Sequence, residues 1–388
     1  MRITHICLVE GYTEGLNYQE NIIIKYQARE GHQVSLLTTD HCFHEGVWGV
    51  CQTESDYINP QGVRIIRLPF LLPVPYILNR KIGLFKNTVK YLEELQPDVI
   101  FIHNLQFQDI SSIVRYKKKN PRVMIYADNH SDFSNSARNW LAKNVLYRFW
   151  WRPCAKRVEP FTKMFFGVLP ARMDFLKNIY GIPEEKISLL VMGADDEAVK
   201  RAKEPTIKEG VRRKFSIAME DFLIVTGGKI DAFKTQTLLL MEAVRNIKDD
   251  RVKLLVFGSV EEGLKERLLS LCDGKKVQYI GWARGEEPYE YFAASDLVVF
   301  PGRHSVYWEQ VVAQKIPMLC KYWEGTTHVD IGGNVEFLTH DSREEIQTKI
   351  EEILNNPSKY ESMKEAACNE KNREFFYSRI AAKSVGLL

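Results

Sequence analysis

The residues best suited to chemistry gather in one stretch of the chain, residues 296–330. Residues 297–300 have the length and β-branched content of a strand buried on both faces, and Pro301 ends that strand. Ser305 is the predicted N-cap of a following helix, with Glu309 about one turn inside it. A tight loop leading into a helix N-terminus is an anion site, because unpaired backbone N–H groups converge there. A carboxylate in that first turn does not suit phosphate, so Glu309 is predicted to accept hydrogen bonds from sugar hydroxyls.

A second loop carries cations before a helix. The apolar run 222–226 leads directly into Gly227 and Gly228, which let the backbone approach a ligand closely. Lys229 and Lys234 follow on the same loop, and two cations at this place suit a diphosphate. The Gly-Lys-Ser/Thr ending of a P-loop is missing at the required spacing. The alternative interpretation is a pair of exposed lysines that flank a helix start.

Polar residues also follow two apolar runs in the first half of the chain. Residues 103–106 come after one run and residues 128–138 after the next. Ligands of open α/β sheets bind beyond the carboxyl ends of the strands, so both stretches are candidate site segments. The second stretch contains Asp128, His130 and Asp132, although a lone histidine is more often a structural residue than a catalytic one.

The loop 10–17, which follows the first apolar run, is polar and contains Gly11 and Gly15. This spacing is not the G-x-G-x-x-G fingerprint of dinucleotide-binding proteins, and no third glycine follows. A nicotinamide-dependent dehydrogenase is therefore disfavoured.

The segment 138–157 combines basic and aromatic residues and contains no acidic residue. This composition is typical of a helix at a membrane interface, where aromatic rings sit at headgroup level and cations meet anionic lipid. The alternative is an aromatic contact between helices with a solvated basic face.

Length and composition exclude several classes of protein. A chain of 388 residues predicts two domains of roughly 180 residues each. The balance of 53 basic and 50 acidic residues argues against a nucleic-acid-binding protein. Seven cysteines without a CxxC or Cys/His cluster predict reduced thiols, no structural zinc and a cytoplasmic setting. Residues 1–4 lead directly into a strand-like run, so we expect no signal peptide, and the sequence contains no run of about 18 apolar residues.

Strand-like runs alternate with helix-length segments along the whole chain, which predicts α/β domains with doubly wound parallel sheets. A turn, a short strand and a polar stop lie between residues 178 and 195. We place the domain boundary there, with a first domain over 1–190 and a second over 191–371.

The block 295–301, a loop, a helical glutamate and then residues 313–317 resemble the donor-binding motif of retaining GT-B glycosyltransferases of family 4. That motif usually has two glutamates eight positions apart, followed by a small residue, a glycine and a proline. Here only Glu309 is present, and counting back from Pro317 the expected glutamate falls on Gln310, one position away. We take Glu309 as the second, ribose-facing glutamate. The first, sugar-facing glutamate has no counterpart, and His304 or Ser305 is the candidate replacement.

The resemblance implies two Rossmann-like domains that face a central cleft, with a last helix, at about 372–388, that crosses back to the first domain. It implies no cofactor and no metal, because GT-B enzymes are generally metal-independent and the nucleotide-sugar is a substrate. The implied catalytic residues are His130, Glu309 and Lys234. The implied donor-binding residues are Gly15, Lys229, Lys234, His304, Ser305, Val306 and Glu309. The implied acceptor-side residues are Tyr12, Asn17, Asp128, Asp132 and Arg138.

The function expected from this resemblance is transfer of a sugar, with retention of configuration, from a nucleotide-sugar to a glycan or lipid-linked glycan in bacterial polysaccharide biosynthesis. The enzyme would be cytoplasmic, with peripheral membrane contact through residues 138–157. One alternative is a non-catalytic protein of the same fold that binds a sugar nucleotide or a glycan. Another is a nucleotide-sugar epimerase.

Overall fold

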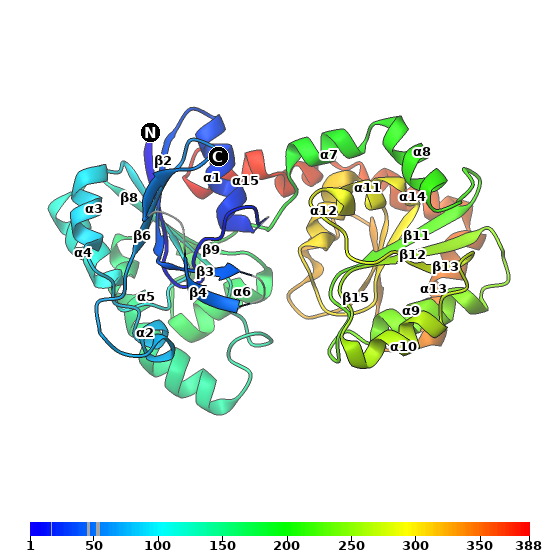
Figure 1. The fold of residues 1–388 in the computed structure, drawn as a ribbon, viewed down its shortest axis with the longest axis horizontal. Coiled ribbons are helices and arrows are strands. Elements are labelled where there is room, and N and C mark those ends of the chain that lie inside the picture. The colour runs from blue at the N-terminus through cyan, green and yellow to red at the C-terminus, as the bar shows by residue number, and fades with distance from the viewer. Residues whose placement is uncertain (17, 45–46, 52–54) are drawn as a thin grey trace. The chain divides into compact units, whose positions relative to one another are not determined.

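The computed structural model describes residues 1–16, 18–44, 47–51 and 55–388. The chain divides into two compact units, which are drawn in Figure 1. Unit 1 comprises Met1–Met192 together with Tyr377–Leu388, and unit 2 comprises Gly193–Phe376. Each unit is an α/β domain with a largely or wholly parallel sheet, which confirms the predicted fold class. Asn17, a predicted acceptor-side residue, lies outside the described residues.

Unit 1 is built on an eight-stranded sheet of order β10-β9-β8-β7-β1-β2-β6-β5. All neighbours pair in parallel except β5 and β6, which are antiparallel. In the central strand β1, Ile3 pairs with Val34 on one side and Val99 on the other, and every residue after Arg2 is buried. The strands are β1 Arg2–Cys7, β2 Gln33–Thr39, β5 Asp56–Ile58, β6 Arg64–Leu68, β7 Val99–His103, β8 Met124–Asn129, β9 Met164–Gly167 and β10 Ile187–Leu189.

Helices flank this sheet and include the C-terminal helix of the chain. Helix α1 packs against α15, so that the two ends of the sequence meet within unit 1 (Figure 1). Helix α1 ends before Gly31, whose φ of +79° is the left-handed conformation expected of a glycine that stops a helix. The α-helices are α1 Gln19–Arg29, α2 Tyr76–Ile82, α3 Thr88–Leu95, α4 Ile110–Lys119, α5 Arg152–Val158, α6 Pro170–Phe175 and α15 Tyr377–Ser384.

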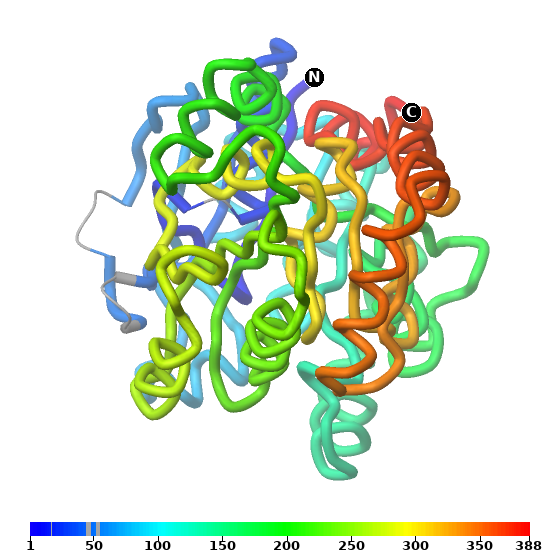
Figure 2. The backbone as a smooth tube through the Cα atoms, turned by 90° about the vertical axis from the view of Figure 1, so that its right-hand side faces the viewer, coloured from blue at the N-terminus to red at the C-terminus, as the bar shows by residue number. Residues whose placement is uncertain are grey.

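The basic and aromatic segment forms a π-helix, η1, over Ala142–Trp151, which continues into α5. It stands at the lower end of unit 1 in Figure 1 and Figure 2. Trp151 at its end is buried, whereas several apolar side chains along it are exposed. One side of the helix is therefore anchored to the core and the other is left to solvent.

Unit 2 contains a six-stranded sheet, entirely parallel, of order β13-β12-β11-β14-β15-β16. Its strands are β11 Phe222–Gly227, β12 Val252–Phe257, β13 Val277–Tyr279, β14 Leu297–Phe300, β15 Met318–Lys321 and β16 Val335–Leu338. Its α-helices are α7 Asp196–Ala202, α8 Pro205–Lys214, α9 Gln236–Asn246, α10 Glu262–Ser270, α11 Glu287–Ala294, α12 Tyr307–Gln314, α13 Arg343–Asn355 and α14 Pro357–Ala367. The central strands β11 and β14 are adjacent, so the two loops singled out from the sequence leave the same edge of the sheet.

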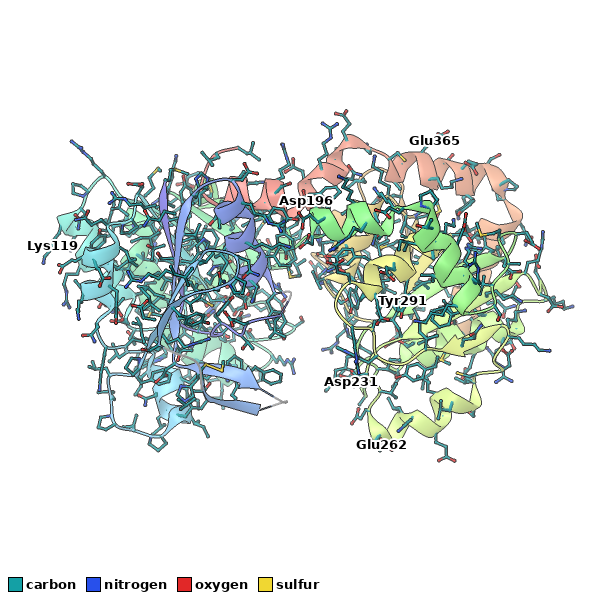
Figure 3. The ribbon with its side chains drawn as sticks, turned by 45° about the horizontal axis from the view of Figure 1, so that its top comes forward. Lys119, Asp196, Asp231, Glu262, Tyr291 and Glu365 are labelled. Carbon is teal, nitrogen blue, oxygen red and sulfur yellow. A yellow bond between two sulfur atoms is a disulfide. The ribbon has the colours of Figure 1, made fainter. Side chains whose placement is uncertain are left out.

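The structure corrects the expectation that all seven cysteines are reduced. Cys42 and Cys51 form a disulfide, which is drawn as a yellow bond in Figure 3. Cys42 lies in β3 (His41–His44), which pairs antiparallel with β4 (Val47–Val50), and Cys51 follows β4 directly. The hairpin brings the two Cα atoms to 5.4 Å, a usual separation for a disulfide. The nine-residue separation does not resemble a CxxC motif, so the sequence pattern did not reveal the pair.

No helix among the described residues is both long enough and apolar enough to cross a membrane.

Candidate functional site

A pocket lies at the carboxyl edge of the unit 2 sheet, where the loops after β11 and β14 meet. It brings together Lys229, Lys234 and Ser305, three of the donor-binding residues predicted from the sequence. The residues that line it are Thr226, Gly227, Gly228, Lys229, Ile230, Lys234, Thr237, Phe257, Phe300, Pro301, Gly302, Arg303 and Ser305. Glu309, His304 and Val306 are not among them.

Glycine is required where these loops pack. A Cβ on Gly227 would come within 2.1 Å of the Phe257 ring. Gly258, which follows β12, has φ of +129°, and a Cβ there would come within 1.8 Å of the carbonyl oxygen of Gly228. The Gly228 amide in turn donates to the Phe257 carbonyl at 3.1 Å. Gly227 therefore packs under the Phe257 ring, and Gly258 brings its backbone close to that of Gly228.

The pocket is strongly cationic. Burial lowers the pKa of Lys234, and the nearby Arg303 and Lys229 lower it further against the opposing effect of Asp231. Asp231, labelled in Figure 3, forms an ion pair with one of these cations, since its Oδ2 lies 3.2 Å from Lys229 Nζ. Arg303, which the sequence analysis missed, holds its guanidinium 5.2 Å from the centre of the Phe233 ring. A bound anion would relieve the repulsion among the three cations, so the pocket suits a phosphate or diphosphate group.

Helix α12 opens beside this pocket, one residue later than predicted. Its N-cap is Val306, and Ser305 makes no capping hydrogen bond. The Ser305 hydroxyl is instead buried without a hydrogen-bond partner in the described structure, although Ser305 lines the pocket. The prediction of Ser305 as N-cap is therefore wrong, because the chain begins to turn helically only at Val306.

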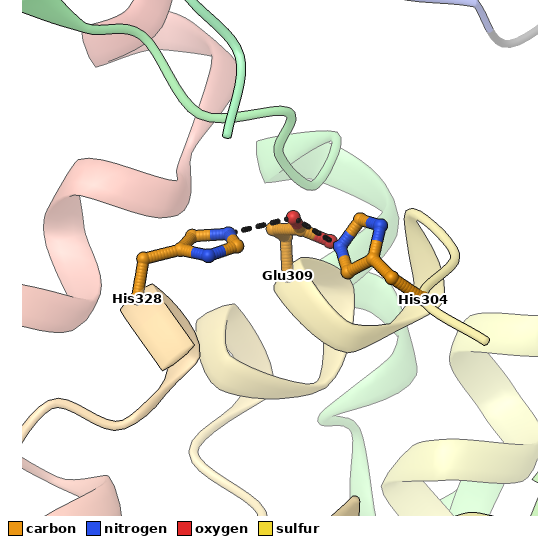
Figure 4. Close-up of side chains that lie close together, drawn as sticks. All are labelled: His304, Glu309 and His328. Atoms are coloured by element: carbon orange, nitrogen blue, oxygen red, sulfur yellow. Dashed lines mark hydrogen bonds and ion pairs between the residues drawn. The ribbon is translucent and has the colours of Figure 1, made fainter. Parts of the chain in front are cut away.

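Glu309 lies in the first turn of α12, fully buried, between two imidazole rings (Figure 4). Its Oε1 accepts hydrogen bonds from Nε2 of His304 at 2.8 Å and from Nε2 of His328 at 2.9 Å. Burial alone would raise the pKa of Glu309, but the two histidines outweigh it and lower the pKa to about 2. Its Oε2 is buried without a partner among the described residues. No local sequence signal pointed to His328, which lies 19 residues from Glu309.

These three side chains are the kind of set that can hold a metal ion, since one ligand atom of each lies within 4.8 Å of the others. Both imidazole nitrogens, however, are at hydrogen-bond distance from the same carboxylate oxygen. The protons that they donate occupy the space between nitrogen and oxygen. The cluster is therefore a buried hydrogen-bonded triad of one carboxylate and two imidazole rings.

The one-residue offset noted in the sequence has a structural counterpart. Successive residues of a helix point about 100° apart, so Glu309 and Gln310 face different surroundings. Glu309 faces its two histidines, while Gln310 is also buried and its Oε1 has no partner in the described part of the chain. The carboxylate at position 309, one residue before the position expected from the motif, therefore contacts the two histidines of the triad.

The polar strand ends of unit 1 form a second cluster around Asp128, which is fully buried at the end of β8. Its Oδ2 lies 3.0 Å from His103 Nδ1 and 3.3 Å from His130 Nε2, and its Oδ1 accepts from the Asn104 amide. Burial opposes a charge on His130, but Asp128 outweighs it and raises the pKa of His130 to about 9. His130 is therefore a cation at neutral pH. The sequence identified Asp128 and His130, but the partner His103 had no signal beyond its place at a strand end.

The remaining predicted residues have other surroundings. Asp132 accepts from Ser134 and Asn135 within its own turn and pairs with Arg172 at 3.3 Å. Arg138 is exposed, and its Nε donates to the Ser134 carbonyl. These two acceptor-side candidates hold the loop after β8.

The loop after β1 contains two further candidates. Tyr12 is buried, and its hydroxyl oxygen accepts from the Asn59 side chain at 3.2 Å. Gly15 has φ of +76° and open space around its Cβ position. Tyr12 thus belongs to the packing of unit 1, while Gly15 provides a left-handed turn.

The comparisons with known proteins agree with this architecture. Residues 22–198 match the model of Glycosyltransferase Family 4, and residues 207–370 match that of Glycosyl transferases group 1. No curated protein sequence matches the chain significantly. The solved structures that it resembles include HepE from Anabaena in complex with UDP (TM-score 0.69, 15% identity, 99% and 98% of the two chains covered). WaaG, a glycosyltransferase involved in lipopolysaccharide biosynthesis, gives a TM-score of 0.66 with 15% identity, covering 99% and 100%. UDP-GlcNAc 2-epimerase from Neisseria meningitidis, bound to UDP-GlcNAc, gives 0.61 with 12% identity, covering 99% and 98%.

Two parallel-sheet units, of which the second has a glycine-floored cationic pocket, define a protein of the GT-B fold. The two glycosyltransferase family models match successive parts of the chain, and the chain is a family 4-like glycosyltransferase.

Replacing Gly258 with alanine tests the close packing under the pocket. We expect Gly258→Ala to lower the free energy of unfolding by about 1–3 kcal/mol, because the residue has a positive φ and its Cβ would meet the Gly228 carbonyl. Urea denaturation followed by circular dichroism measures this change. The control is Gly263→Ala in α10, where a Cβ meets nothing within 4 Å. Equal stabilities of the two variants would contradict the packing argument.

Replacing Glu309 with glutamine tests the triad. We expect Glu309→Gln to cost about 3–5 kcal/mol near neutral pH, because two imidazole rings lose their buried anion. The folded-state pKa of Glu309 lies below its ordinary value of 4.5, at about 2, so its stabilisation is present above pH 4.5 and is lost as the pH falls through 2.

Denaturation of wild type and variant between pH 2 and pH 7 therefore gives curves that converge toward the acid end. The control is Glu365→Gln, which changes an exposed carboxylate and should leave the stability nearly unchanged. A constant difference across this range would refute the assignment of an ionised Glu309.

Proposed function

We propose that the protein is a retaining glycosyltransferase that transfers a sugar from a nucleotide-sugar donor to a glycan or lipid-linked glycan in bacterial polysaccharide biosynthesis. The observation that carries the proposal is the unit 2 pocket, where Lys229, Lys234 and Arg303 surround a glycine floor. The HepE and epimerase structures that the chain resembles hold UDP and UDP-GlcNAc, which supports a nucleotide-sugar as the donor. The role of WaaG in lipopolysaccharide biosynthesis supports a glycan or lipid-linked acceptor.

The cations account for the chemistry of the leaving group. Sugar transfer leaves a nucleoside diphosphate, whose growing negative charge must be stabilised in the transition state. In this proposal Lys234, Lys229 and Arg303 supply the positive charge, and the N-terminus of α12 adds its dipole. Preorganised cations need no reorganisation during the reaction, so the reaction proceeds without a metal ion.

The triad gives His304 a defined role in donor recognition. His304 lies between Arg303 and Ser305, which both line the pocket, and Glu309 fixes its imidazole through a 2.8 Å hydrogen bond. Because Glu309 is enclosed by two rings, we assign the direct contact with donor hydroxyls to His304. It would thereby replace the sugar-facing glutamate that the family motif usually supplies. In unit 1, the cationic His130 would donate a hydrogen bond to a hydroxyl of the transferred sugar.

A nucleotide-sugar epimerase is a second candidate, because the Neisseria epimerase shares the fold over almost the whole chain. An epimerase returns an altered sugar still attached to its nucleotide, whereas a transferase or a hydrolysing transferase releases the nucleotide. A non-catalytic binding protein would retain the donor unchanged. The three functions therefore differ in whether the nucleotide is released from the sugar and in whether the sugar is altered.

The test is a panel of UDP-, GDP-, ADP- and dTDP-sugars, with nucleotide release measured enzymatically and sugar products followed by NMR. We expect release from one donor, with Lys234→Ala lowering kcat/KM by roughly 10- to 100-fold, because it removes a charge-assisted hydrogen bond to the diphosphate. Lys265→Ala, an exposed lysine on α10, is the matched control and should keep wild-type activity.

Conversion of a donor into its epimer without release would favour the epimerase. Thermal stabilisation by a donor without any turnover would favour the binding protein. Equal activity of Lys234→Ala and Lys265→Ala would contradict the role of the pocket.

We further propose that the enzyme works at the inner face of the cell membrane and contacts it through η1. In η1, Phe149 is 74% exposed and Val145 is exposed, and of the two residues directly before η1, Trp140 is 70% exposed and Leu141 is exposed as well. Residues 138–157 contain no acidic side chain, so the exposed surface is apolar and basic together. A bilayer rich in anionic lipid matches both properties, since it accepts the apolar side chains and attracts the cations.

Vesicle co-sedimentation tests this contact. We expect binding to vesicles of phosphatidylcholine with phosphatidylglycerol, weaker binding at high salt, and loss of at least tenfold in affinity for the double variant Leu141→Gln with Phe149→Gln, because each buried apolar side chain contributes about 1.5–3 kcal/mol. Leu269→Gln, which changes a residue 50% exposed in unit 2, is the control. Equal binding of the double variant and the control would exclude η1 as the contact.

A further inference from the structure

A continuous chain of buried hydrogen bonds leads from the C-terminal helix to His130. In α15, the Ser384 hydroxyl donates to the Ala381 carbonyl at 2.8 Å, and its oxygen accepts from Gln27 Nε2 at 3.0 Å. Gln27 Oε1 lies 2.6 Å from His5 Nε2. The chain continues from His5 Nδ1 to His103 Nε2 at 2.9 Å and then reaches Asp128, described above. It crosses α1, β1, β7 and β8, four elements that meet only in the folded unit 1.

The direction of each hydrogen bond follows from the Ser384 hydroxyl. Since Ser384 already donates its only proton, it can only accept from Gln27, which places the amide oxygen of Gln27 against His5. A carbonyl oxygen accepts, so His5 carries its proton on Nε2. Burial, with a smaller effect of His103, lowers the pKa of His5 to about 3, so His5 has only this one proton at neutral pH.

The donors and acceptors along the chain also determine which nitrogens of His103 carry protons. His5 Nδ1, which has no proton, must accept, so His103 donates from Nε2. His103 Nδ1 faces the Asp128 carboxylate, which also accepts. His103 therefore carries a proton on both ring nitrogens, and Asp128 lies between two histidine rings that each donate to it.

We propose that Gln27 and His5 are positioning residues that keep His103 doubly protonated, so that His103 neutralises Asp128 and weakens the hold of Asp128 on the His130 proton. Both residues act through His103 and touch no substrate. Their value to the reaction rests on the proposed role of His130 toward the transferred sugar. Helix α15 thereby influences how tightly His130, at the other end of the chain of hydrogen bonds, holds its proton.

Several other charged groups face His130, and all of them belong to unit 1. Asp128 favours its protonation most, Glu10 from the loop after β1 favours it further, and Arg172 on α6 opposes it. Glu20 on α1 is fully buried and interacts with His130 as well, and burial together with Glu10 raises the pKa of Glu20 to about 7. A titration near pH 7 therefore has to be assigned to Glu20 or to His130 by variants of each.

The test is NMR of protein with 15N-labelled histidine, whose ring shifts distinguish a bare nitrogen from a protonated one. The chain has nine histidines, and single His→Gln variants assign them. In the wild type at pH 7 we expect a bare Nδ1 in His5 and protons on both nitrogens of His103. A bare nitrogen in His103 would overturn the proposal.

Gln27→Leu removes the acceptor for His5 Nε2. We expect the His5 proton to move to Nδ1, His103 to lose its Nε2 proton, and His130 to bind its proton roughly tenfold more tightly, because an opposing charge near Asp128 is gone. Ser384→Ala, which removes one hydroxyl, should change His103 in the same direction if Gln27→Leu does not fold. Gln347→Leu in unit 2 is the matched control, and its histidine spectrum should be that of the wild type.

The spectrum does not depend on turnover, so this test stands even if no donor is found. An unchanged His103 in both Gln27→Leu and Ser384→Ala would overturn the proposal. With an active donor, the pH dependence of kcat should move to higher pH in Gln27→Leu. A changed spectrum with an unmoved pH profile would leave the proton assignment intact and remove His130 from the reaction.

Discussion

Burying a carboxylate in a protein costs several kcal/mol unless cations or hydrogen-bond donors surround it, and this chain does so in each of its two units. Asp128 and Glu309 are both fully buried, and each accepts from two histidine rings. Both carboxylates have a lowered pKa, because the paired imidazoles outweigh the cost of burial. These contacts connect His130, in the loop after β8, and His304, in the loop after β14, to buried carboxylates.

The consequence for function is that neither carboxylate is presented directly to a ligand. Each one instead orients a histidine, His130 in unit 1 and His304 in unit 2, and Asp128 also raises the pKa of His130. A histidine held by a buried carboxylate can donate a hydrogen bond from a fixed position, and the raised pKa of His130 keeps that ring charged at neutral pH. In the proposed function, His304 supplies the polar contact that the missing glutamate of the family motif would make.

The unit 2 pocket depends on a different constraint, namely the lack of side chains at three glycines. Gly227, Gly228 and Gly258 allow the strands β11 and β12 to end with their loops in backbone contact, and the cations then stand around that floor. These cations repel one another, which contributes to the lowered pKa of Lys234, and a bound anion would reduce this repulsion. The glycines thus determine how closely the loops pack, whereas the cations would determine the affinity for an anion.

The sequence by itself determined the strands and the polar residues at their ends, because apolar runs of this length and the glycines after them are local signals. It also located Lys229, Lys234, Asp128 and His130 at the correct sheet edges. Only the tertiary structure decided which groups became partners. His5, His103 and Asp128 lie on three strands, Cys42 meets Cys51 through a hairpin, and Glu309 meets His328 across a loop. Such contacts depend on strand register and helix rotation, where a shift of one residue moves a side chain to another surface, and no local pattern encodes that choice.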